Sequence, residues 1–150
     1  MPEQPITVQD LLADVSLLAI STTALSAERV DIASENAAEE AAIDPDYRLM
    51  TNARDDESGF RIILETRISA QPGNIGCTVQ AEYGLEALRA NEVPADAMEE
   101  FINNVALMSL LPFVRQAIAD ITLRVFEAPL MMPIIKRGDL SFGLPDGVQD

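Results

Sequence analysis

The feature that most constrains the fold of this chain is a stretch of ten residues without a charge, from Val105 to Val114. It lies in the run NNVALMSLLPFVRQAI (103–118), whose apolar spacing predicts a helix. A helix that is apolar all round must be covered on more than one side. Pro112 stands inside the stretch, and proline costs a helix interior ~3 kcal/mol. We therefore expect a kink, or two abutting helices with Pro112 near the first turn of the second, covered from both sides.

The helical pattern starts at Pro94, where Asp96 and the next acids suit the positive end of a helix dipole. Apolar residues at helical spacing then continue on both sides of Pro112. They are Met98, Phe101, Ile102, Val105 and Met108 before it, and Val114, Ala117, Ile118, Ile121 and Val125 after it.

Four runs before this helix have the pattern of strands. Residues 14–25 are apolar and β-branched on both faces, which predicts a strand covered on both sides or one at a subunit interface. The runs 46–56, 60–70 and 75–85 alternate, and turn residues separate them at 57–59 and 71–74. Short connections imply an antiparallel meander with one wet face.

These elements predict an α+β fold, a four-stranded antiparallel meander followed by one long, proline-interrupted helix. A chain of 150 residues fits a single domain over 1–150, with a core over about 12–135 and flexible termini.

Composition excludes several classes of function. The chain has 25 acidic and 10 basic residues, a net charge of −15, which repels nucleic acid and favours basic partners. It has no histidine, and Cys77 stands alone on the apolar face of a strand, where a buried, inert thiol is expected. We expect no catalytic residues, no metal site and no cofactor; a hydrolase that uses acidic residues alone is a minor alternative.

The N-terminus MPEQPITVQD has neither the basic nor the apolar part of a signal peptide. The longest uncharged apolar run is far shorter than the ~20 residues of a membrane span. We therefore expect a cytoplasmic protein that does not insert into membranes.

The segment EAPLMMPIIKRGDLSFGLP (127–145) is apolar, rich in proline and without periodicity. Methionine is common on surfaces that accept many partners, so Met131 and Met132 indicate a binding surface. The segment could equally be an apolar strap that closes one end of the sheet, and the two roles can coexist.

Four short motifs resemble the SecB export-chaperone family: LLPFVRQAI (110–118), LRVFEAPLMMPI (123–134), ADVSLLA (13–19) and CTVQ (77–80). With the order of strands and helix, the resemblance covers roughly residues 12–135. It implies a dimer of dimers, in which long helices lie between two eight-stranded sheets. It also implies a chaperone that holds unfolded polypeptides in apolar grooves without ATP.

The resemblance further implies two sets of site residues in this chain. Those expected to contact clients are Leu18, Ile20, Leu130, Met131, Met132, Ile134, Ile135 and Phe142. Those expected at the oligomer interface are Val105, Met108, Leu111, Pro112, Val114, Ile118 and Ile121.

The chain departs from the export form of the family in two places. Acidic positions on the sheet dock the basic tail of the SecA motor in that family, and Asp14 matches one of them, whereas Leu18 and Thr78 replace two others. Docking of SecA is therefore doubtful, because such complementarity depends on close charge pairs. The second helix of the family is reduced or absent after GDLSF (138–142).

The resulting hypothesis is an oligomeric holdase, more dedicated than the general export chaperone, as in SecB-like proteins of toxin–antitoxin systems or phages. An adaptor or inhibitor that binds one folded partner is the alternative.

Overall fold

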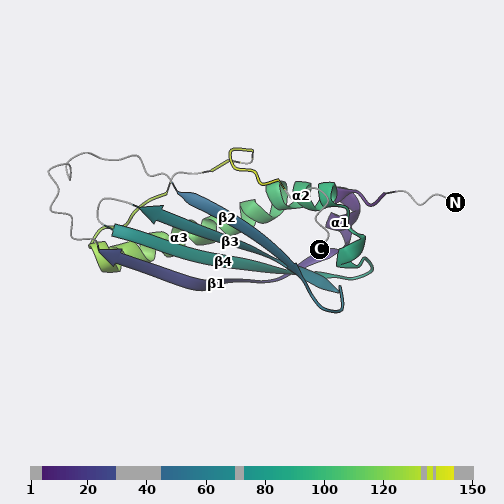
Figure 1. Cartoon of the computed structure of the whole chain (residues 1–150), viewed down its shortest axis with the longest axis horizontal. Coiled ribbons are helices and arrows are strands. Elements are labelled where there is room, and N and C mark those ends of the chain that lie inside the picture. Colours follow the sequence, from purple (N-terminus) through teal and green to yellow (C-terminus); the bar gives the residue numbers. More distant parts are fainter. Residues whose placement is uncertain (1–4, 30–44, 70–72, 133–134, 137, 144–150) are drawn as a thin grey trace.

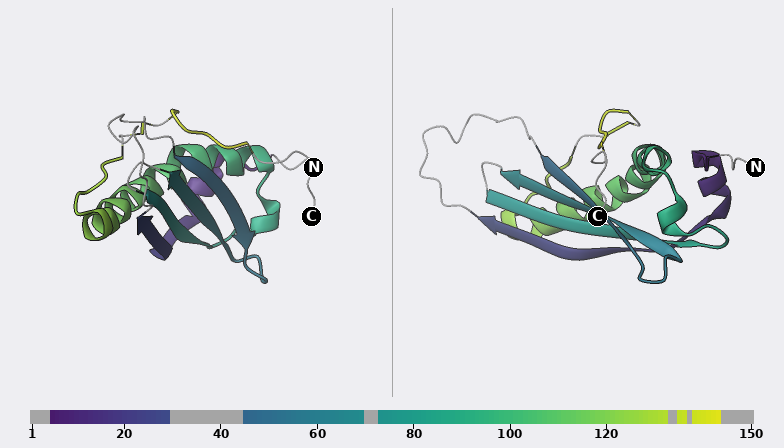
Figure 2. Two further views of the ribbon diagram at one scale, coloured as in Figure 1. Left: turned by 60° about the vertical axis from the view of Figure 1, so that its left-hand side comes forward. Right: turned by 45° about the vertical axis from the view of Figure 1, so that its right-hand side comes forward.

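The computed structural model describes residues 5–29, 45–69, 73–132, 135–136 and 138–143 of the chain. It has two layers, an antiparallel sheet and a long helix that crosses one of its faces (Figures 1 and 2). The sheet has four strands in the order β1-β4-β3-β2. Their bounds are β1 (Val15–Arg29), β2 (Asp46–Ala53), β3 (Gly59–Ser69) and β4 (Gly73–Leu85). The predicted α+β class is confirmed.

Strands β2, β3 and β4 follow one another across the sheet as a meander. In the β2–β3 turn the N–H of Arg54 donates to the carbonyl of Gly59 (2.9 Å), and Glu57 takes a left-handed conformation with φ of 63°. Strand β1 instead pairs with β4, so the connection from β1 to β2 joins opposite edges of the sheet. Residue alternation predicts the strands but carries no information about the edge on which β1 lies.

The two faces of the sheet separate as the alternation predicts. Residues directly opposite on neighbouring strands share a face. On the inner face, which bears the helix, the buried pairs include Leu64 with Val79 and Thr66 with Cys77. Ala70, which was expected on this face, lies outside the described residues.

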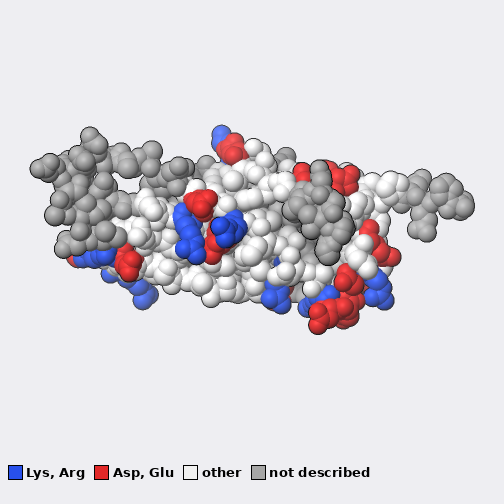
Figure 3. All heavy atoms as spheres, viewed as in Figure 1, with Lys and Arg blue, Asp and Glu red and all other residues white. Residues whose placement is uncertain are grey.

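The outer face is the wet one, and Figure 3 shows uncharged side chains over most of it, with charges in separate clusters. Glu65 and Arg67 form an ion pair there at 3.3 Å. Opposite charges also face each other across the strands: Arg48 and Glu65, Asp46 and Arg67, Arg61 and Glu82.

A short helix that the sequence pattern did not predict, α1 (Val8–Asp14), precedes β1. The hydroxyl of Thr7 accepts from the N–H of Asp10 (3.2 Å), and the carboxylate of Asp10 accepts from the N–H of Thr7 (2.9 Å). This capping box satisfies N–H groups that a helix start leaves free. Within α1, the side chain of Leu11 is completely buried. The spacing of Thr7 and Asp10 was the available signal.

Asp14, the last residue of α1, ties the start of β1 to the loop that follows β4. Its carboxylate accepts hydrogen bonds from the N–H groups of Glu86 (3.0 Å), Ala87 (2.8 Å) and Leu88 (2.9 Å). These bonds, that of Leu88 first, lower the pKa of Asp14 because they favour its charged form. This acid therefore has a structural role at the junction of three elements.

After a short 3-10 turn, η1 (Ala90–Glu92), the long helix begins after Pro94, as predicted. It has three parts: α2 (Ala95–Phe101), a π-helical turn η2 (Ile102–Ala106) and α3 (Leu107–Phe126). Of the two outcomes expected at Pro112, a kink or two abutting helices, the second is wrong, because Pro112 lies inside α3 and the irregular turn precedes α3. The exposed Pro112 is tolerated within a helix that packs along its length on the sheet.

The π turn keeps one stripe of the helix on the sheet. Buried residues follow at intervals of four along α2 and α3, except between Phe101 and Ala106, where the interval is five. A π turn absorbs one extra residue, so the residues on either side stay in phase. Ala97 before it and Leu110 after it therefore belong to the same buried stripe.

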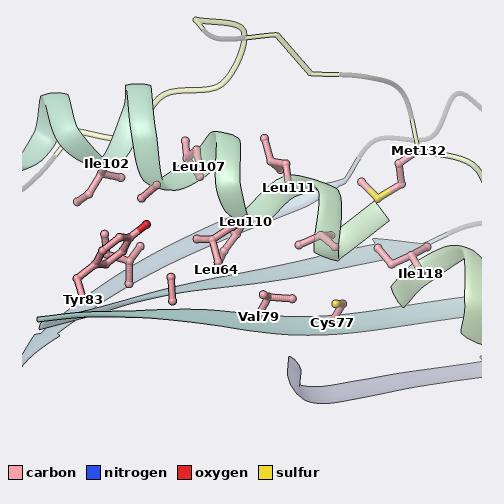
Figure 4. Close-up of a cluster of buried hydrophobic side chains, with 14 of the residues drawn as sticks. Leu64, Cys77, Val79, Tyr83, Ile102, Leu107, Leu110, Leu111, Ile118 and Met132 are labelled. Atoms are coloured by element: carbon pink, nitrogen blue, oxygen red, sulfur yellow. The ribbon is translucent and has the colours of Figure 1, made fainter. Parts of the chain in front are cut away.

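This stripe and the inner face of the sheet make the core (Figure 4). Leu110, Val114 and Ile118 of α3 are fully buried above the strands. By length and composition alone, the 32-residue helix Ala95–Phe126 would also suffice to cross a membrane, a property that core helices share.

The role of the π turn predicts opposite results for two deletions of exposed residues. Deleting Asn104 removes the extra residue and leaves a regular helix with its stripe in phase, so we expect a change of about 1 kcal/mol or less in the free energy of unfolding. Deleting Gln116 rotates one part of the helix against the other by about 100°, so we expect a loss of more than about 3 kcal/mol. Urea denaturation measures both, and equal losses would contradict the phasing.

The bonds of Asp14 predict a pH-dependent stability. Because its pKa is lowered in the folded state, its contribution is present at neutral pH and is lost as the pH falls below about 4 and through the folded pKa. We expect Asp14→Asn to lower the melting temperature at pH 7, and the difference from the parent protein to shrink below pH 4. Asp55→Asn, which removes the same charge from an exposed turn, is the control and should change little. A pH-independent difference would contradict this account.

Candidate functional site

Within the described residues, no group of three or more His, Cys, Asp or Glu side chains could hold a metal ion. Cys77 is 1% exposed, and its burial raises the pKa of the thiol to about 11, so it stays protonated at neutral pH. The predicted buried and inert thiol is confirmed.

The clearest candidate is the segment after α3, here called the C-terminal strap: the described residues from Glu127 to Gly143. The helix ends at Glu127, which takes a left-handed conformation with φ of 66°. From there the strap runs back along the long helix to α2, on the side of the sheet that bears the helix (Figure 1). No described residue of the strap is helical. The tail from residue 144, where the second helix was expected to be reduced or absent, lies outside the described residues.

Three side chains of the long helix hold the strap, and each is hydrogen-bonded to the main chain of the strap. The hydroxyl of Thr122 accepts from the N–H of Leu130 (2.8 Å), and Nε of Arg115 donates to the carbonyl of Met132 (3.2 Å). Nearer the helix start, the amide of Asn103 both accepts from the N–H and donates to the carbonyl of Phe142 (2.8 and 3.0 Å). The order of these contacts makes the strap antiparallel to the helix.

The side chains of the strap divide between the core and solvent. Met132 is 3% exposed, whereas its neighbour Met131 is 62% exposed. Leu130, Ile135 and Phe142 are half-buried and pack against the core. Ile134, which was also expected to contact clients, lies outside the described residues. The strap thus closes part of the core and also presents an apolar side chain to solvent.

The structure does not bring Leu18 and Ile20 together, although their spacing would place them on one face of a regular strand. The pairing of β1 with β4 shifts between Leu17 and Ala19, so Leu18 is the extra residue of a β-bulge. Ile20 pairs with Ala81 on the inner face, whereas Leu18 lies over Gly84 on the outer face. A single groove that contains both residues is therefore excluded for one chain.

The inner face of β1 carries exposed apolar residues that the sequence pattern did not single out. Leu17 lies opposite Tyr83, and Leu25 lies opposite Cys77. Both remain 39% or more exposed, because β1 is an edge strand. On α3, Phe113 and Leu123 are also exposed.

The residues expected at an oligomer interface occupy three environments. Leu111, Val114 and Ile118 lie in the core of the chain itself, and Pro112 is exposed. The other members of the set, which are half-buried, are Val105, Met108 and Ile121. The sheet of the same chain therefore provides much of the cover that the sequence assigned to a second subunit.

The three positions considered for SecA docking lie near β1 and β4. Asp14 is engaged by three N–H groups, as described above. Leu18 and Thr78 bring no charge to the outer face, where the carbonyl of Thr78 accepts from the hydroxyl of Thr23 (3.4 Å). A docking role for Asp14 stays a prediction.

Comparison with known proteins gives similarity in structure and none in sequence. No family model matches the chain, and no curated protein matches it. The fold is similar to that of the Mycobacterium tuberculosis SecB-like chaperone Rv1957, in its complex with a ChAD peptide from the Rv1956 HigA1 antitoxin. The TM-score is 0.69 at 15% identity, over 85% of this chain and 92% of that one.

A protein of unknown function from Streptococcus agalactiae is similar with a TM-score of 0.50 at 12% identity, over 81% of this chain and 98% of that one. Identities this low establish the fold alone. On that ground the chain has the SecB-like fold that its short motifs had indicated.

Proposed function

We propose that this protein is a SecB-like molecular chaperone of the cytoplasm that holds extended apolar segments of non-native polypeptides without ATP. The observation that carries the proposal is a set of large apolar side chains left exposed on the helix-bearing layer and on the inner edge of the sheet. They are Leu17, Leu25, Phe113, Leu123 and Met131. We infer a binding surface from their common location, because apolar side chains that stay exposed on one side of a folded domain are typical of such surfaces.

The similarity in structure supports the class of ligand. The SecB-like chaperone with a similar fold binds a peptide from an antitoxin. The strap of this chain is likewise held along the helix by bonds to its main chain. We therefore favour a dedicated polypeptide client, as in toxin–antitoxin systems, over general export.

The charge of the chain bears on which clients it accepts. With a net charge of −15, it attracts segments in which basic residues flank apolar ones, and it keeps its complexes soluble. The proposal extends to assembly into a dimer of dimers through residues that the chain leaves accessible on its long helix. These are Val105, Met108, Pro112 and Ile121.

A holdase assay with two matched variants tests the proposal. We expect the parent protein to suppress light scattering from an aggregating client at equimolar amounts, and Met131→Glu to lose several-fold of this capacity. Met50→Glu is the control, because Met50 is also an exposed methionine but lies on the outer face opposite Ile63. Equal losses of suppression in both variants would contradict a specific role of the strap in client binding.

The holdase assay, together with the recovery of binding partners from a lysate, distinguishes the chaperone from the alternative function. No suppression at equimolar amounts would contradict the chaperone, and one stoichiometric folded partner recovered from a lysate would favour an adaptor or inhibitor.

Docking of the SecA tail gives a further prediction. Because Asp14 is occupied by backbone bonds, and because Leu18 and Thr78 carry no charge, we expect calorimetry to detect no binding of the basic zinc-containing tail. Micromolar binding that Asp14→Asn weakens would contradict this expectation.

A further inference from the structure

The contact between Asn103 and Phe142 has the form of strand pairing. The side-chain amide oxygen of Asn103 accepts a hydrogen bond from the N–H of Phe142 (2.8 Å), and its amide nitrogen donates to the carbonyl of Phe142 (3.0 Å). Two residues of neighbouring antiparallel strands exchange hydrogen bonds in this way. The side chain of Asn103 therefore offers to the strap what an edge strand would offer.

This contact does not depend on the identity of the bound residue. Both bonds go to main-chain groups, which every residue except proline can supply. The same holds for Thr122 and Arg115, which bond the main chain of Leu130 and Met132. A helix flank that binds main chain in this way suits extended polypeptides of many sequences.

The two ends of the strap are held unequally. At the proximal end, Thr122 is fully buried and Met132 is 3% exposed. At the distal end Phe142 is only half-buried, and among the described residues its hydrogen bonds to the helix come from Asn103 alone. The distal end can therefore leave while the proximal end stays in place.

The length of the strap also leaves slack at its distal end. The helix positions that hold it, Thr122 and Asn103, are about 28 Å apart along the axis. The chain from Leu130 to Phe142 could span about 40 Å when extended. A turn takes up the difference: the N–H of Asp139 donates to the carbonyl of Lys136 (2.9 Å), and the carboxylate of Asp139 accepts from the N–H of Lys136 (3.0 Å).

We propose that Asn103 is a binding site for the main chain of an extended, non-proline client segment, and that the distal strap (Leu140–Gly143) occupies it in the free protein as an internal competitor. This inference rests on the proposed function and specifies how the site is regulated. The client places a bulky apolar side chain where Phe142 packs, because that position borders the core. Asn103 also lies in the π turn, and such turns often occur at functional sites.

Two variants that loosen the distal strap, one by removing the packing of Phe142 and one by removing the amide of Asn103, should change client binding in opposite directions. The probe is fluorescein-labelled, reduced and carboxymethylated α-lactalbumin, a permanently unfolded polypeptide, and binding is followed by anisotropy with the full chain. We expect Phe142→Ala to tighten binding several-fold, because it weakens only the competitor. We expect Asn103→Ala to weaken binding by about tenfold, because it removes two bonds to the client. Asn104→Ala, an exposed amide in the same turn, is the control and should bind as the parent does.

Hydrogen exchange at the main-chain amide of residue 142 completes the test, and it should accelerate in Phe142→Ala and in Asn103→Ala but not in Asn104→Ala. If Phe142→Ala does not fold, a chain that ends at Asp139 replaces it and should also bind more tightly. Equal affinities in all variants would overturn the inference and leave the chaperone standing. No binding by any of the proteins would overturn both.

Discussion

The packing of one helical stripe on the inner face of the sheet is the interaction on which the rest of this structure depends. Leu110 and Ile118 are fully buried above the strands that carry Leu64 and Val79 (Figure 4), and Val114, which lies between them on the helix, is fully buried as well. Burial of apolar surface at about 25 cal/mol per Å² makes such a seam the main source of stability. Because the seam fixes the helix over the sheet, it also fixes the flank along which the strap lies.

A protein built in this way has apolar surface beyond what one helix covers. The edge strand β1 keeps Leu17 and Leu25 exposed on the inner side, and the helix keeps Phe113 and Leu123 exposed. The strap covers part of this apolar surface, and main-chain bonds and a few buried side chains hold it there. What remains open is the surface through which we propose that the protein meets its clients and its own copies. High net negative charge keeps such a surface compatible with solubility.

Hydrophobic periodicity in the sequence predicted the strand faces and the helix start, whereas features without a periodic signal were missed. Alternation in 60–70 and 75–85 assigned the inner face correctly, and Pro94 marked the helix start. The bulge at Leu18 was missed, because one extra residue reverses the faces of a strand without any change in composition. Periodicity also shows that a face is covered but not by what, so Val114, which the chain's own sheet and strap bury, was expected at an interface with a second subunit. The role of Asn103 was missed as well, since a side chain that bonds main chain leaves no matching residue in the sequence.

The π turn η2 has a consequence for how this helix can change. A single inserted residue normally turns every later side chain away from its contacts, and a core helix then loses its partner surface. Here the extra residue is absorbed within Ile102–Ala106, and the buried residues on both sides keep their places. The helix can thus gain a polar group beside the core without repacking it. An amide such as that of Asn103 is a local addition to the scaffold, and its chemistry can vary independently of the fold.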